Sequence, residues 1–247
     1  MGGRGTATDR GSEKFGSAGA GGGGVEGYGK AEQALARKLF GKNMSGAELA
    51  TLAGADGFAG GASIKVAIFE GRLKVDLKHK DIDMRKDYGM RRSFFKDAKG
   101  KLTIENESFF LKASAQGKGI GADSFRTQVQ AAKNAGVKNI TTFALRNDAR
   151  KDRAVGHIAW ANLGYNAPLS AAMQRAWVGR NPLAQFSGVK PPRTVRELYN
   201  RKGGKALWAE KGEGGRMIFS LKRGSVSLKA LNGYLKGKGR PRSEEHT

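Results

Sequence analysis

The sequence of 247 residues contains no cysteine, which excludes disulfide scaffolds, cysteine-based zinc sites and thiol catalysis. Its three histidines, His79, His157 and His246, lie far apart in the sequence, so we expect no metal site. No apolar run approaches the roughly 20 residues of a membrane-spanning helix, so we expect no membrane contact. Acidic residues are also scarce, with 22 Asp and Glu against 45 Lys and Arg. What remains is a basic globular protein, for which we predict a cytoplasmic location.

The excess of basic residues is the first indication of a partner. A net charge of +23 is typical of a protein that meets a polyanion, which could be nucleic acid, an anionic surface or a nucleotide cofactor. Residues 193–242 alone contain 14 Lys or Arg and 3 Glu. No motif that enters a DNA groove is present, so any nucleic-acid contact would be non-specific. The alternative is that the basic side chains only keep a glycine-rich chain in solution.

Composition divides the chain into five parts. Residues 1–29 contain 12 glycines and too few apolar side chains to offset the entropy of ordering them, so we predict a flexible tail. A short helical region is expected at 30–61, and the main domain at 62–170. A basic, α-rich extension at 171–235 and a loose tail at 236–247 complete the chain.

The main domain is predicted to be α+β. Apolar residues alternate on both sides of Glu70-Gly71, which is the pattern of a β-hairpin. A second pair of strands is expected at 90–96 and 102–111. The remaining elements follow as a helix through 125–132, a strand at 137–145 and a helix at 155–163. Strands followed by one β-α-β-α unit predict a mixed sheet flanked by helices.

Helix starts are also marked outside the β-rich part of the chain. Ser45 with Glu48, and Thr194 with Glu197, have the spacing of a capping box, and Ser225 is placed to cap a last helix. A brief strand is indicated at 217–219. The extension also contains three aromatic residues that either stack on bases or, as packing residues, fill the core: Trp177, Phe186 and Tyr199.

One glycine loop has the composition of a phosphate site. Gln116-Gly117-Lys118-Gly119-Ile120-Gly121 lies between a predicted strand and a predicted helix. Glycines allow positive φ and close approach of a ligand, and the first turn of a helix offers unpaired N–H groups to an anion. The spacing matches neither a P-loop nor the dinucleotide fingerprint. A plain turn is the alternative explanation.

In its context the loop resembles the signature of the GNAT superfamily of N-acetyltransferases. That signature is Gln/Arg-x-x-Gly-x-Gly/Ala at the start of a long helix, and Gln116, Gly119 and Gly121 occupy its positions. Leu163-Gly164-Tyr165 looks like the Leu-Gly-Phe element that follows the last helix of that family. The resemblance covers about residues 62–170.

The resemblance implies an acetyl-CoA site. Backbone amides of the loop would hold the pyrophosphate, and the end of the preceding strand would splay and pair with the pantetheine arm. The residues implied in this binding are Leu111, Lys112, Ala113, Gln116, Gly117, Lys118, Gly119, Ile120, Gly121 and Ala122.

The same resemblance implies direct transfer of the acetyl group to an amine acceptor, which the sequence does not identify. A carboxylate removes the amine proton in such enzymes, and the candidates here are Glu105 and Glu107. They lie two apart on a predicted strand and therefore on one face, which could equally be a solvated face. Many family members have a Tyr acid where this chain has Trp160, and an indole N–H does not act as an acid. On the alternative view, Trp160 and Tyr165 are core aromatics.

A second resemblance indicates a different function. Residues 156–166 are similar to a GNAT-like module of phage head or packaging proteins and of large mobile-element polypeptides, and the segments at 203–208 and 225–235 resemble the region that follows in that group. This resemblance implies a non-catalytic structural or nucleic-acid-associated module, in the host cytoplasm or the virion. Two hypotheses therefore stand: an acetyl-CoA-dependent N-acetyltransferase and a binding module.

Overall fold

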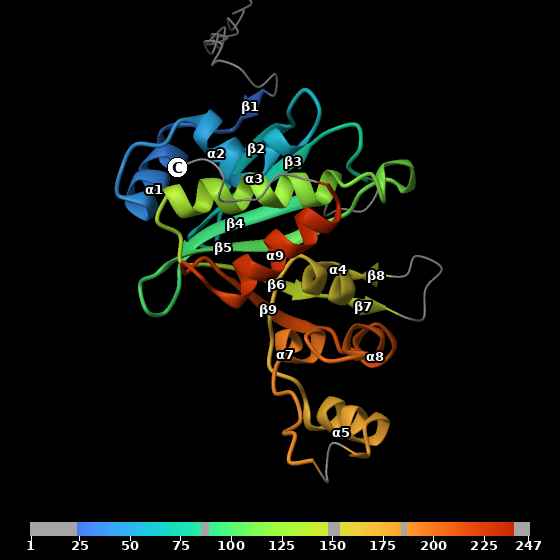
Figure 1. Ribbon diagram of the computed structural model, residues 1–247. Coiled ribbons are helices and arrows are strands. Elements are labelled where there is room, and N and C mark those ends of the chain that lie inside the picture. The colour runs from blue at the N-terminus through green and yellow to red at the C-terminus, as the bar shows by residue number, and fades with distance from the viewer. Residues whose placement is uncertain (1–23, 85–88, 148–153, 184–186, 240–247) are drawn as a thin grey trace, which may run out of the picture.

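The structure is a computed structural model that describes residues 24–84, 89–147, 154–183 and 187–239. Its architecture is α+β, with one seven-stranded mixed sheet in the order β1-β2-β3-β4-β5-β6-β9 and flanking helices (Figure 1). The predicted tails at 1–29 and 236–247 lie largely outside the described residues.

The N-terminal part supplies one short strand and two helices. Strand β1 (Val25–Glu26) pairs in parallel with β2, and helices α1 (Lys30–Phe40) and α2 (Gly46–Ala53) follow. The predicted capping box is present, because the Ser45 hydroxyl accepts from the Glu48 N–H and the Glu48 carboxylate accepts from the Ser45 N–H. A 3-10 turn at Ala55–Gly57 then packs on helix α3.

Four antiparallel strands form the centre of the sheet: β2 (Ser63–Phe69), β3 (Arg72–Lys78), β4 (Met90–Lys96) and β5 (Leu102–Phe109). The predicted turn between β2 and β3 is confirmed, since Glu70 and Gly71 both have positive φ, at 50° and 69°. The register between β4 and β5 shifts between Arg91 and Arg92, so that Glu107 is the extra residue of a β-bulge.

A crossover helix links two parallel strands. After β5 the chain forms a 3-10 turn at Ala113–Ala115, then α3 (Ile120–Asn134), and returns as β6 (Asn139–Ala144) parallel to β5. Gly136, with φ 73°, closes α3 as predicted. Strands β7 (Arg146–Asn147) and β8 (Ala154–Val155) form a separate hairpin before α4 (Gly156–Asn162).

The extension contributes to the same sheet. Its helices are α5 (Ala171–Arg180), α7 (Val195–Tyr199), α8 (Gly204–Lys211) and α9 (Val226–Gly237). Between α8 and α9, strand β9 (Gly215–Ser220) pairs antiparallel with β6. Strands from both sides of residues 62–170 therefore complete the sheet, which extends beyond the predicted main domain.

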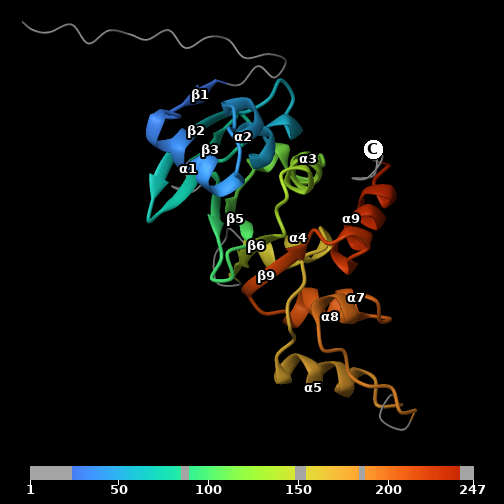
Figure 2. The ribbon, with the colours of Figure 1, turned by 90° about the vertical axis from the view of Figure 1, so that its left-hand side faces the viewer.

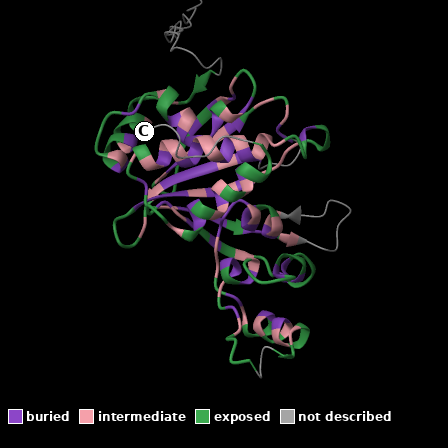
Figure 3. Ribbon diagram, in the orientation of Figure 1, coloured by how far each residue is buried: buried purple, intermediate pink, exposed green. Residues whose placement is uncertain are grey.

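Helices gather on one face of the sheet, and the core lies between them and the strands. Figure 2 shows α3 and α9 on the same side of the strands, and in Figure 3 many residues of α3 and of the central strands are buried. Alternate residues such as Leu73, Val75 and Leu77 are fully buried on this side. We call the opposite side the open sheet face. Large apolar side chains are exposed on it, with Phe69 at 53% and Phe143 at 59%.

Candidate functional site

The glycine loop lies at the start of α3, as predicted. Gly117 and Gly119 have φ of 76° and 83°, and Gly119 is the N-cap of the helix, with no side chain capping this end among the described residues. Gly121 is needed for a different reason: a Cβ there would lie 3.0 Å from Cε1 of Phe109. Turn geometry and this contact thus account for all three glycines, whether or not a ligand binds.

Some of the implied cofactor-binding amides are already used within the protein. The N–H of Lys112 donates to Asp81, that of Gln116 to Lys112 and Ala113, and that of Ala122 to Gly119. Between Gln116 and Ala122, the amides of Gly117, Gly119, Ile120 and Gly121 donate no backbone hydrogen bond to the described residues. These four fit an anion, and a pyrophosphate would be held by them rather than by the whole run from 116 to 122.

The two parallel strands part next to this loop. The ladder between β5 and β6 ends at the pair Asn106 and Thr142, although β5 continues to Phe109. The predicted strand end at 111–113 is wrong in detail. Leu111 instead forms a bridge with Ile82, and a 3-10 turn begins at Ala113, so this segment is held against residues 81–82.

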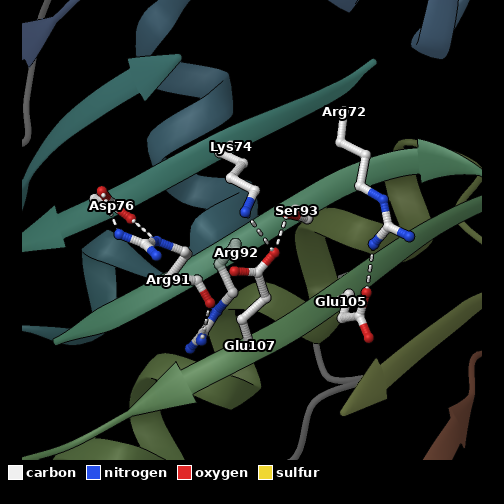
Figure 4. A network of polar contacts seen from close by, with 8 residues as sticks. All are labelled: Arg72, Lys74, Asp76, Arg91, Arg92, Ser93, Glu105 and Glu107. Carbon is white, nitrogen blue, oxygen red and sulfur yellow. Dashed lines mark hydrogen bonds and ion pairs between the residues drawn. The ribbon is translucent and has the colours of Figure 1, made fainter. Parts of the chain in front are cut away.

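The two candidate bases lie on the open sheet face and are engaged with cations (Figure 4). Glu105 accepts from Arg72 at 2.6 Å, and Glu107 lies 3.5 Å from the Lys74 ammonium and accepts from Ser93 at 2.5 Å. The prediction that both face one side is confirmed, because both line the same hollow with Arg72 and Lys74. Arg91 and Asp76 form a further bidentate pair beside them.

A shallow hollow of about 360 Å³ lies over these carboxylates. It is lined by Glu70, Arg72, Lys74, Glu105, Glu107 and Phe143. The hollow contains carboxylates, cations and one aromatic ring, which is the chemistry that receives a cationic or amine-bearing group.

Trp160 and Tyr165 belong to the aromatic core. Their ring centroids are 5.0 Å apart, and both rings contact Phe125 of α3. The Tyr165 hydroxyl is buried and accepts from Asn106, which also exchanges hydrogen bonds with Gln128. Burial raises the pKa of Tyr165 far above its ordinary value, because the phenolate would lose its hydration. Neither side chain supplies a proton donor to the hollow.

Arg92 is a buried cation that the sequence does not reveal. It alternates with the polar residues of β4 and faces the core, with only 2% of its surface exposed. Its guanidinium donates to the carbonyls of Arg91 and Ser108, and its Nε has no partner among the described residues. Burial lowers the pKa of Arg92 to about 10, and the nearby Tyr165 and Glu107 oppose this shift. A positive group therefore lies beneath the bulge at Glu107.

The cation partners of Glu105 and Glu107 could have been inferred from their sequence spacing, which is the same as that of the two glutamates. Arg72 and Lys74 are also two residues apart on a strand, as are the two glutamates, so each pair lies on one face. What the sequence alone does not specify is that β4 lies between β3 and β5, with Ser93 below the four charged groups.

Comparison of the chain with protein-family models, with curated proteins and with solved structures returned no match. Among the described residues, no helix is both long and apolar enough to cross a membrane.

Proposed function

We propose that the protein is a GNAT-like N-acetyltransferase that binds acetyl-CoA and transfers the acetyl group to an amine. The observation that supports this most is the parting of β5 and β6 after Asn106 and Thr142, beside a helix start with available amides. Ligands of open α/β sheets bind at the carboxyl ends of parallel strands, where a helix start can accept their phosphates. We place the reaction in the cytoplasm.

In this proposal some residues bind the pyrophosphate of acetyl-CoA and others accept the proton of the amine. Amides of Gly117, Gly119, Ile120 and Gly121 hold the pyrophosphate. Acetyl-CoA supplies an acetyl group activated as a thioester. The hollow on the open sheet face receives the acceptor amine, whose nitrogen bonds to the acetyl carbon as the carbon–sulfur bond breaks. Glu107 or Glu105 accepts the amine proton.

The departing thiolate receives no proton from the aromatic core. Trp160 has no acidic proton, and Tyr165 is buried with a raised pKa. A thiol has a pKa near 8.5, so a CoA thiolate would be able to leave without a proton from either residue.

The second candidate is a non-catalytic, GNAT-like structural or nucleic-acid-associated module of a phage or mobile element. The observation that favours it is the engagement of both candidate bases in ion pairs, together with Trp160 in the core. A module of this kind has no need of acetyl-CoA.

Calorimetric titration with acetyl-CoA and with free CoA tests the proposal. We expect micromolar binding, and we expect Gly119→Asp to weaken it about 100-fold because a carboxylate would face the pyrophosphate. Gly136→Asp is the matched control, since it places the same side chain at the other end of α3, at a similar positive φ and in open space. No binding at millimolar ligand, or an equal loss in both variants, would contradict the proposal.

A further inference from the structure

A group of cations around the α7–α8 turn lies apart from the proposed acetyl-CoA site and pairs with no acidic side chain of the described residues. We call Arg196, Arg201, Lys202 and Lys205 the α7–α8 cation cluster. No ion pair to any of the four is present among the described residues, in contrast to the cations of the open sheet face. The last three side chains are exposed.

The acidic side chains of this region interact with groups outside the cluster. Glu197 accepts from the N–H of Arg193 at 2.7 Å, Glu210 pairs with Arg180, and Glu213 accepts from Ser170 at 2.8 Å. The cluster is therefore a local excess of positive charge rather than half of a salt-bridge network.

Aromatic rings lie against three of these four cations. The Arg196 guanidinium lies 4.4 Å from the centre of the Tyr199 ring, and the Lys205 ammonium 5.8 Å from the same ring. Arg201 lies over Trp177 at 5.8 Å. A ring holds a cation by its face and leaves the N–H groups of that cation available, whereas a carboxylate occupies them.

The approach of α8 to α7 brings these groups together. A Cβ on Gly204 would lie only 1.8 Å from the carbonyl oxygen of Leu198, so glycine is required where the two helices meet. This contact places Lys205 over the ring of Tyr199.

The burial of the Arg196 side chain is unfavourable for the stability of the fold. Only 7% of its surface is exposed, and its Nε and Nη2 are buried without a hydrogen-bond partner among the described residues. Burial lowers the pKa of Arg196, although Tyr199 opposes the shift. A buried cation without a carboxylate is destabilising by itself, and an anion placed beside it would offset part of that cost.

We propose that the α7–α8 cation cluster binds the phosphate backbone of nucleic acid without reading its sequence. Arg201, Lys202 and Lys205 contact phosphates, and Arg196 adds its charge from beneath them. Among the described residues no carboxylate forms an ion pair with the cluster, and its rings are covered by cations rather than open to bases. Backbone contact is therefore the mode that it supports.

Fluorescence anisotropy of the full chain with labelled oligothymidylate of about 20 nucleotides, across a salt series, tests this inference. The variant is Arg201→Gln with Lys205→Gln. Its matched control is Lys65→Gln with Lys78→Gln, which removes the same charge from two exposed lysines that pair with Glu26. We expect the first pair to weaken binding about tenfold and to lower the salt slope by about 1.5, and the control to change affinity less than about twofold.

Equal losses in the two double variants would overturn the inference, because the charge of the whole chain would then be responsible. Absence of binding by the unmodified chain, or competition by poly-glutamate as strong as that by unlabelled oligonucleotide, would also overturn it. None of these results bears on acetyl-CoA binding, which the calorimetric titration measures separately.

Arg196→Met supplies a second readout. Methionine fills a similar space without charge, so we expect the thermal midpoint to stay or rise while nucleic-acid affinity falls about threefold. A lower midpoint with unchanged affinity would show that Arg196 is only a packing residue and would remove it from the site.

Discussion

The open sheet face and the α7–α8 cation cluster contain the same kinds of basic side chain but give them different partners. On the sheet, Arg72 and Lys74 of β3 lie against carboxylates of β5, across the intervening β4, and Arg91 of β4 lies against a carboxylate of β3. Around the α7–α8 turn, Arg196 and Lys205 lie against Tyr199. A carboxylate cancels the charge of its cation, and a ring does not, so only the second region presents net positive charge.

This difference shows where on the protein the positive charge is unpaired, which the net charge alone does not show. The pairs on the sheet are half-buried, so the loss of hydration offsets much of their attraction. Their main effect is to set the local charge and to orient Glu105 and Glu107. The net charge of +23 therefore gives little attraction for an anion on this face. Carboxylates suit the sheet to an amine, and their absence suits the α7–α8 cation cluster to phosphates.

The largest expected effect tests whether a carboxylate of the sheet accepts a proton in the reaction in addition to forming an ion pair. If Glu107 accepts the amine proton, Glu107→Gln lowers kcat for acetyl transfer by about 100-fold or more while the acetyl-CoA dissociation constant stays unchanged. Glutamine still accepts from Ser93, so the local fold is kept. The control is Glu70→Gln, which lines the same hollow. Equal rates in the two variants would remove Glu107 from the reaction.

A smaller effect tests whether pairing is what separates the two regions. The triple variant Asp76→Asn, Glu105→Gln and Glu107→Gln removes the acidic partners from the open sheet face. We expect nucleic-acid affinity at low salt to rise about tenfold and the salt slope to steepen by about 2. Unchanged affinity would mean that something other than the ion pairs keeps polyanions from this face.

The smallest effect concerns the ring beneath the cluster. Burial raises the pKa of Tyr199 to about 12, with Arg196 opposing the shift, whereas an unfolded tyrosine titrates near 10. The unfolded state therefore loses this proton first, and stability falls as the pH rises from about 10 to about 12, by at most about 1.4 kcal/mol per pH unit. Tyr199→Phe should reduce that slope in urea unfolding. An identical slope would indicate that the ring is solvated.

Much of the fold could be predicted because its signals are local. The β2–β3 turn, the capping box at Ser45, the cap at Ser225 and the closure of α3 at Gly136 each depend on a few neighbouring residues. The position of β9 in the sheet could not be predicted, because the apolar residues at 217–219 indicate a strand but not the strand with which it pairs. Its pairing with β6 is set by packing of segments far apart in the sequence.

The candidate sites follow the same division. The place of the glycine loop before α3 and the shared face of Glu105 and Glu107 could be predicted from spacing, and Trp177 is confirmed as a packed aromatic. Phe186 lies outside the described residues. The partners that decide the chemistry come from other strands and helices. Two surfaces equally rich in Lys and Arg are indistinguishable in sequence when one is matched by carboxylates only after folding.

Strand β9 also has a consequence for synthesis of the chain on the ribosome. Strand β6 ends at Ala144, and the strand that covers its outer edge begins only at Gly215. A nascent chain therefore carries an unpaired sheet edge, beside the apolar Phe143, until residues 215–220 have emerged. Pairing of residues 215–220 with β6, rather than completion of the central hairpins, is the step that covers this edge.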